Sequence, residues 1–285
     1  RFFTHREPAE CINSNFTAQL NLQDFFLDKV GAYMCKNART KTKLVFSITE
    51  TKRPLIGIIN RDSCYSGNGQ PWRDSDIQKY KECIYELVSL GFSVVRLNSV
   101  GYPLNISSQY VTDLATSDCT VEEQFSLMSS LDLFVGTATG ASEFPSQLFM
   151  KPSLWIDSSI MYQVGYSHRV VHVPKRLSIY NEDLFRSRQP SQLLRYLLRS
   201  PWTDFTAHDF GLRIEPLNIH FITQTIIQFV NYHKAIRTVY HSLHDLFSDS
   251  SHAPEAVDIL VDSSTYDMVK TLLSLNRGSY ESPLI

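Results

Sequence analysis

The chain has 285 residues, of which 43% are hydrophobic and 20% charged, and its formal net charge at pH 7 is −2. This composition is typical of a globular protein with a sizeable core, and the small net charge argues against broad electrostatic binding to nucleic acid. No apolar run approaches the roughly 20 residues of a membrane span. The five cysteines are odd in number and none forms a C-x-x-C pair, so we expect reduced thiols and a cytoplasmic protein.

The first 53 residues are mixed in pattern, with an amphipathic helix predicted over 22–34 and a strand over 43–49. A Lys-Arg-Pro break at 52–54 precedes the continuous apolar run PLIGIIN at 54–60. Such a run is typical of a strand buried on both faces. A polar loop follows at 61–74.

Helices and strands then alternate. A capping box of Ser75 and Gln78 predicts a helix over 75–90, and a second box of Thr120 and Glu123 predicts another over 120–130. The remaining predicted elements are strands at 92–98, 131–137 and 152–157 and a helix at 142–150. This order predicts an α/β fold, a Rossmann-like parallel sheet with helices on both faces, and places any ligand at the carboxyl ends of the strands.

The last 130 residues are less regular. We expect a strand at 170–174, a helix at 191–200 and a long helix at 221–243. The predicted organisation is an N-terminal segment (1–53) that is a partial second lobe or linker, a Rossmann-like domain (54–240) and a C-terminal helical extension (241–285). Arginines flank the Leu-rich helix at 191–200; they indicate a solvated face or, alternatively, peripheral contact with an anionic membrane surface.

The segment GTATGAS, 136–142, follows the apolar run LDLFV. Glycine allows close backbone approach to a ligand, and hydroxyls with free N–H groups attract an anion. Both the lysine-containing phosphate loop and the dinucleotide fingerprint are absent. The segment is therefore either an anion-binding loop or a tight turn capped by Ser142.

Arg61 follows the strand predicted at 54–60 and faces the same edge of the sheet. Its planar, permanently charged fork suits a phosphate, although a surface pair with Asp62 is the alternative. Asp74-Ser-Asp76 formally matches a metal-binding Asp-x-Asp pattern, but these residues open a helix, where acidic side chains suit the dipole. No histidine pair has zinc-site spacing, so we expect no metal.

Together these segments resemble a family of bacterial glycosyltransferases associated with surface polysaccharide and lipopolysaccharide synthesis. The resemblance covers roughly 54–235, through PLIGIINRDSCY, WRDSDIQKYKECIYELVSLGFSVVRLNSVGYPL and MSSLDLFVGTATGASEFPSQLFMKPSLWID. The matching residues are Arg61, Asp62, Ser63, Tyr65, 73–76, Arg96 and 136–140. The chain departs from the family pattern at Asp74, Thr139 and Ile58, where Asn, Ser and His are expected; the last departure puts a base at that position in doubt.

The resemblance implies a GT-B donor-binding domain, distantly similar to protein O-fucosyltransferases. It implies metal-independent transfer of a sugar from a nucleotide sugar to a hydroxyl of a glycan or lipid-linked acceptor, with no cofactor, in the cytoplasm or at the inner face of the membrane. On this basis Arg61 and Arg73 bind the pyrophosphate and Asp62 is a candidate general base. The implied donor-binding residues of the later loop are Gly136, Thr137, Thr139, Gly140, Ser142 and Glu143, the last at the ribose.

Two other functions remain open at this point. One is a non-catalytic nucleotide-sugar-binding or scaffold module of a glycan-assembly complex, and the other is a GT-B-like nucleotide-sugar epimerase. A GT-B enzyme needs a second domain for its acceptor, and the 53 residues before the first predicted strand are too few for a whole Rossmann domain. The second lobe is then reduced, or the chain binds donor without turning it over.

Overall fold

The fold is described from a computed structural model. It describes residues 43–49, 52–64, 70–97, 101–149, 151–159, 170–189 and 203–231, together with 192, 196, 241–242, 258–261, 266–267 and 270–271. The helix predicted at 22–34, and nearly all of the one predicted at 191–200, lie outside these residues. Within them, no helix has the length and apolar character needed to cross a membrane.

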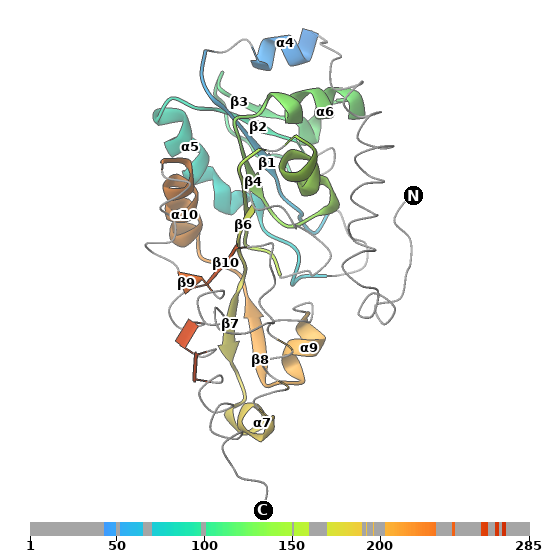
Figure 1. Cartoon of the computed structure of the whole chain (residues 1–285). Coiled ribbons are helices and arrows are strands. Elements are labelled where there is room, and N and C mark those ends of the chain that lie inside the picture. Colours follow the sequence, from blue (N-terminus) through green and yellow to red (C-terminus); the bar gives the residue numbers. More distant parts are fainter. Residues whose placement is uncertain are drawn as a thin grey trace, which may run out of the picture.

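The centre of the molecule is one twisted sheet with the strand order β3-β2-β1-β4-β5-β6-β10-β9 (Figure 1). All neighbours pair in parallel except β10 and β9. The strands are β1 (Leu55–Ile59), β2 (Ser93–Arg96), β3 (Val111–Asp113), β4 (Leu133–Gly136), β5 (Ser153–Ile156), β6 (Val170–Val173), β9 (His241–Ser242) and β10 (Asp258–Val261). The first six follow the Rossmann order 3-2-1-4-5-6, so the strand order reverses between β1 and β4.

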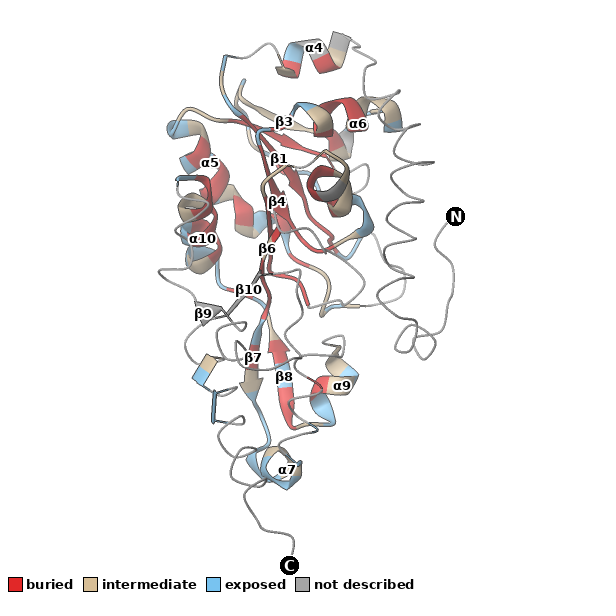
Figure 2. Cartoon of the chain, viewed as in Figure 1, coloured by how far each residue is buried: buried red, intermediate tan, exposed pale blue. Residues whose placement is uncertain are grey.

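Helical layers cover both faces of the sheet. On one face lie α5 (Lys81–Ser89), with the short helix η2 (Ile77–Tyr80) before it, and α10 (Ile219–Asn231); on the other lie α4 (Lys43–Thr49) and α6 (Val121–Ser130) (Figure 1). Along β1 the side chains alternate between the two: Ile56 and Ile58 pack in the α5 and α10 core, whereas Leu55 and Ile59 pack in the α4 and α6 core. The buried residues accordingly lie along the strands and the inward helix faces (Figure 2).

A smaller antiparallel pair extends from the sheet beyond β6. It consists of β7 (Arg176–Ile179) and β8 (Leu212–Glu215), accompanied by α7 (Glu182–Ser187) and α9 (Asp204–His208) (Figure 1). Lys175 lies directly before β7, and its Nζ reaches the carbonyls of Pro71 and Asp74 in the segment between β1 and η2. The strands predicted at 54–60, 92–98, 131–137, 152–157 and 170–174 are confirmed as β1, β2, β4, β5 and β6.

The prediction of a strand at 43–49 is wrong, because this segment is the helix α4. Val45 and Ile48, three residues apart, are buried against the α6 side of the sheet. The hydroxyls of Ser47 and Thr49 donate to the carbonyls of Leu44 and Val45, which a helical turn brings within reach. Tertiary packing of one face therefore overrides the strand preference of the β-branched residues.

Three predicted helices differ from the structure at their ends. The first starts at Ile77 rather than 75, because Asp76 caps it and the Ser75 hydroxyl donates to Asp157 instead. The helix predicted at 142–150 is two short turns, η4 (Gly140–Ser142) and η5 (Phe144–Leu148), and Thr139 rather than Ser142 caps the first. The helix predicted over 221–243 does not reach that far, because His241–Ser242 is the strand β9. The capping box of Thr120 and Glu123 is confirmed at α6.

Candidate functional site

The candidate site lies at the carboxyl ends of β1 and β4, where the strand order reverses. Ile59 and Gly136 are register partners at the last pair of these strands. Just beyond them the main-chain N–H of Arg61 donates to Thr137 Oγ1 over 2.8 Å. The two segments that the sequence singled out, Arg61 and the 136–142 loop, are therefore joined directly, at the point where ligands bind in open α/β sheets.

Hydroxyls inside the 137–142 loop shape it rather than face solvent. Ser142 Oγ donates to the Thr137 carbonyl over 2.6 Å and lies 2.9 Å from Thr139 Oγ1, and both Thr137 and Ser142 are buried. The exposed part of the loop is Gly140 and Ala141. A Cβ built on Gly140 would meet no atom within 4 Å, so the main chain there faces open space.

Gly136 has a different role from Gly140. A Cβ on Gly136 would overlap the carbonyl oxygen of Ile59, because the main chains of β1 and β4 approach closely there. The structure thus explains this glycine by strand packing, whereas its predicted part in donor binding stays a prediction. The loop is also held from β5 and β6: Ser158 Oγ accepts the Ala138 N–H at 3.1 Å and contacts His172 Nε2 at 3.2 Å. Burial lowers the pKa of His172 to about 4, so this imidazole is neutral near pH 7.

Arg61 follows β1, and 9% of its side chain is exposed. Its Nε pairs with Asp74 Oδ1 at 2.9 Å, and its Nη2 donates to Gln70 Oε1 at 3.3 Å. The same Gln70 oxygen accepts a hydrogen bond from Arg73 Nη1 at 3.1 Å. The two arginines predicted to bind a diphosphate are therefore brought together through one amide oxygen, and Asp74 partly offsets their charge.

A buried lysine holds the turn that carries these partners. Lys175 Nζ donates to the carbonyls of Pro71 and Asp74 at 2.8 and 2.6 Å, and burial lowers the pKa of this ammonium. Asp157, fully buried at the end of β5, ties further segments together: it accepts the Ser75 hydroxyl at 2.6 Å and the Leu217 N–H at 2.6 Å. These residues were not singled out from sequence, because their partners lie about 60 to 105 positions away.

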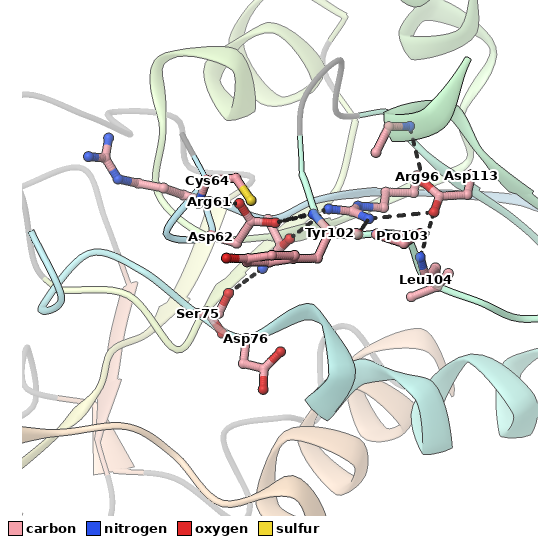
Figure 3. Close-up of polar contacts among 12 residues, drawn as sticks. Arg61, Asp62, Cys64, Ser75, Asp76, Arg96, Tyr102, Pro103, Leu104 and Asp113 are labelled. Carbon is pink, nitrogen blue, oxygen red and sulfur yellow. Dashed lines mark hydrogen bonds and ion pairs between the residues drawn. The ribbon is translucent and has the colours of Figure 1, made fainter. Parts of the chain in front are cut away.

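Asp62, the predicted base, is committed to a buried network (Figure 3). Its Oδ1 accepts the Cys64 N–H at 3.0 Å, and its Oδ2 accepts the Tyr102 N–H at 3.0 Å and pairs with Arg96 Nη2 at 3.3 Å. Only 3% of the residue is exposed. Since a base needs an accessible lone pair within reach of the substrate hydroxyl, this geometry counts against a base role for Asp62.

Arg96 is the centre of that network and is fully buried. Besides Asp62 it pairs with Asp113 Oδ2 at 3.5 Å, and its Nη1 donates to the Tyr102 carbonyl. In the sequence Arg96 is recognisable as a charged residue at the end of an apolar strand, β2. A charge in that position needs a partner at the same edge of the sheet.

The carboxyl of Glu143 lies in different surroundings from that of Asp62. It follows Ser142 at the junction of η4 and η5 and is half-buried. Burial raises the pKa of its carboxyl to about 7. A group that titrates near neutral pH both accepts and releases protons readily, which is what general acid–base chemistry requires.

Two further kinds of site, a metal centre and a pocket, were sought among the described residues. Within the described ranges, no three His, Cys, Asp or Glu side chains are grouped as metal ligands. A pocket of about 370 Å³, lined by residues that include Arg53, Leu55 and Asp132, lies at the amino end of β1. That is the opposite edge of the sheet from Arg61, where α/β proteins do not normally bind their substrates.

Comparison with known proteins gives no relative: no family model, no curated protein and no solved structure matches this chain. The class is therefore defined by the fold alone. The chain is an α/β protein with a Rossmann-like parallel sheet, and its polar residues gather at the strand-order reversal.

Proposed function

We propose that the edge formed by β1 and β4 binds the diphosphate of a nucleotide sugar, and that the protein is a metal-independent glycosyltransferase. The observation that carries the proposal is the hydrogen bond from Arg61 N to Thr137 Oγ1, which sets an arginine beside an exposed glycine loop at the strand-order reversal. The resemblance to bacterial glycosyltransferases of surface-glycan synthesis supports the same activity.

In the proposed reaction the bond between the anomeric carbon and the diphosphate breaks, and a bond from that carbon to an acceptor oxygen forms. The guanidinium groups of Arg61 and Arg73 and the main chain at Gly140 stabilise the charge that develops on the leaving diphosphate. The acceptor hydroxyl loses its proton, and Glu143 suits this step better than Asp62, whose two oxygens are already bonded. A phosphate at this position competes with Asp74 for Arg61.

The proposed acceptor is a glycan or lipid-linked hydroxyl, and the proposed location is the cytoplasm or the inner face of the membrane. The non-catalytic alternative has one observation in its favour. Among the described residues, the β7–β8 pair is the main structure outside the large sheet, and it is much smaller than a second Rossmann domain. A turnover assay separates the functions: release of nucleoside diphosphate only when acceptor is present indicates a transferase, and conversion of donor without acceptor indicates an epimerase.

The site is tested by Arg61→Ala in a thermal-shift and calorimetric screen against nucleoside diphosphates and nucleotide sugars. A ligand that binds only the native state raises the melting temperature. Loss of a charge-assisted hydrogen bond should weaken binding about tenfold to hundredfold. Arg186→Ala is the control, because Arg186 is exposed on α7, where it pairs with the neighbouring Glu182. Equal nucleotide affinity in wild type and Arg61→Ala contradicts the site.

A further inference from the structure

An aromatic ring stands exposed at the same edge of the sheet. Tyr102 follows β2, and 52% of its surface is accessible to solvent. Single exposed aromatic residues are common on protein surfaces and by themselves indicate nothing. Tyr102 differs from the others because buried charges hold its main chain in place.

The anchoring comes from the buried Arg96–Asp62 pair. Arg96 Nη1 donates to the carbonyl of Tyr102, and the Tyr102 N–H donates to Asp62 Oδ2 at 3.0 Å (Figure 3). Burying an arginine costs free energy unless its hydrogen bonds are met, and here one of them goes to the main chain of a residue whose ring faces solvent.

The residues on either side of Tyr102 are also fixed by contacts with buried or hydrogen-bonded side chains. A Cβ on Gly101 would overlap Arg96 Nη2 and lie 2.7 Å from Asp62 Oδ2, so a side chain at this position would displace the ion pair. The Leu104 N–H donates to Asp113 Oδ2 at 2.7 Å, and the Pro103 carbonyl accepts from Gln78 Nε2 at 3.2 Å. A ring on so rigid a segment loses little conformational entropy when a ligand stacks on it.

The Tyr102 ring is held close to the proposed diphosphate site, because its main chain is bonded to the residue next to Arg61. Asp62, which holds the Tyr102 main chain, directly follows Arg61, whose N–H bonds to Thr137. Tyr102 lies on the β1–β2–β3 side of the strand-order reversal. In a Rossmann sheet this half is a complete mononucleotide-binding unit, so a nucleotide with its phosphates at Arg61 extends its base along this side.

We propose that the Tyr102 ring is the stacking platform for the base of the nucleotide whose diphosphate binds at Arg61. This inference rests on the proposed function and adds the subsite for the base. Stacking recognises the flat face that every base presents, and specificity for one base then requires other contacts.

The test separates the base from the phosphates by using two probes, a nucleoside diphosphate and inorganic pyrophosphate. Calorimetric titrations are made with wild type, Tyr102→Leu, Tyr102→Phe and the control Tyr85→Leu; Tyr85 is 55% exposed on α5. The tightest-binding of UDP, GDP, ADP and CDP should bind Tyr102→Leu about tenfold to hundredfold more weakly than wild type. Tyr102→Phe and Tyr85→Leu should bind it as wild type does, and pyrophosphate should bind all four proteins equally.

Several outcomes overturn the inference. Equal diphosphate affinity in Tyr102→Leu and wild type shows that no base stacks there, and an equal loss for pyrophosphate shows that the ring only supports the edge. In these cases the proposed function stands if Arg61→Ala still weakens diphosphate binding about tenfold to hundredfold. If wild type binds neither probe, both proposals fail.

Discussion

At the carboxyl edge of the sheet, residues of the same type differ in their properties because their hydrogen-bond partners and burial differ. Asp62 and Glu143 are both carboxylates of the predicted site. Asp62 accepts hydrogen bonds from two main-chain N–H groups and pairs with Arg96, whereas Glu143 is half-buried and its carboxyl is desolvated. Burial raises the pKa of the Glu143 carboxyl. The two arginines differ in exposure. Arg96 and its partner Asp62 are buried, whereas Arg61 and its partner Asp74 are 9% and 14% exposed.

Glu143→Gln tests this description of the carboxyl through pH. A carboxyl whose pKa rises from 4.5 to about 7 on folding binds more protons in the folded chain between these values, so the stability it contributes falls as the pH rises through that range. The Gln variant lacks this penalty. We expect its advantage in stability over wild type to be about 1–3 kcal/mol larger at pH 8 than at pH 5.

The measurement is urea unfolding at both pH values, with the variant and wild type compared at each. Glu86→Gln, an exposed position on α5, is the control, and its effect on stability should be the same at pH 5 and pH 8. A Glu143→Gln effect that does not depend on pH would mean that the carboxyl is not desolvated.

Elements are positioned by a few close approaches between main chains. One such approach is between β1 and β4, where Gly136 faces the carbonyl of Ile59 and the next residue, Thr137, accepts the Arg61 N–H. The separation of these two strands therefore determines whether the Arg61 side of the site and the 137–142 loop meet.

Gly136→Ala and Gly140→Ala form a matched pair at this junction. Alanine at 136 forces the two strands apart, so we expect a loss of at least about 3 kcal/mol of stability or failure to fold. Alanine at 140 meets no atom within 4 Å, so we expect a change within about 0.5 kcal/mol. Thermal unfolding followed by circular dichroism compares the two, and similar melting temperatures would contradict the close approach.

The whole sheet extends further along the chain than the predicted central domain, 54–240. The strands β9 and β10 come from the segment expected to be a helical extension, and β10 pairs in parallel with β6 through Asp258 with Val171 and Ile259 with His172. The described part of this segment thus covers the edge of the main sheet, and an uncovered parallel edge exposes unpaired main-chain groups.

Removal of residues 241–285 tests this arrangement. Without β10 the edge of β6 is exposed, so we expect a lower melting temperature and concentration-dependent association in size-exclusion chromatography. A chain that lacks only 276–285 keeps both strands and is the control. Equal melting temperatures and elution volumes for the two would show that the extension does not stabilise the sheet.

Much of the fold follows from local pattern. The five central strands are apolar runs bounded by polar or glycine residues, and their alternation with helices indicates a parallel sheet; Thr120 and Glu123 even locate the start of α6. The segment at 43–49 was predicted wrongly because its apolar residues suit a strand or a helix, and only packing against α6 decides between them. Arg61 and the 136–142 loop are candidates from sequence because both lie at the ends of apolar runs that are predicted strands.

By itself the sequence determined the α/β class, the central strands and the two loops that meet at the carboxyl edge, because hydrophobic periodicity and turn residues act over short distances. Only the tertiary structure decided that β1 and β4 are neighbours, that Asp62 is paired with Arg96, that Lys175 holds the turn beside Arg61 and that Glu143 titrates near neutral pH. These properties depend on burial and on partners tens of residues away, and no local pattern specifies either.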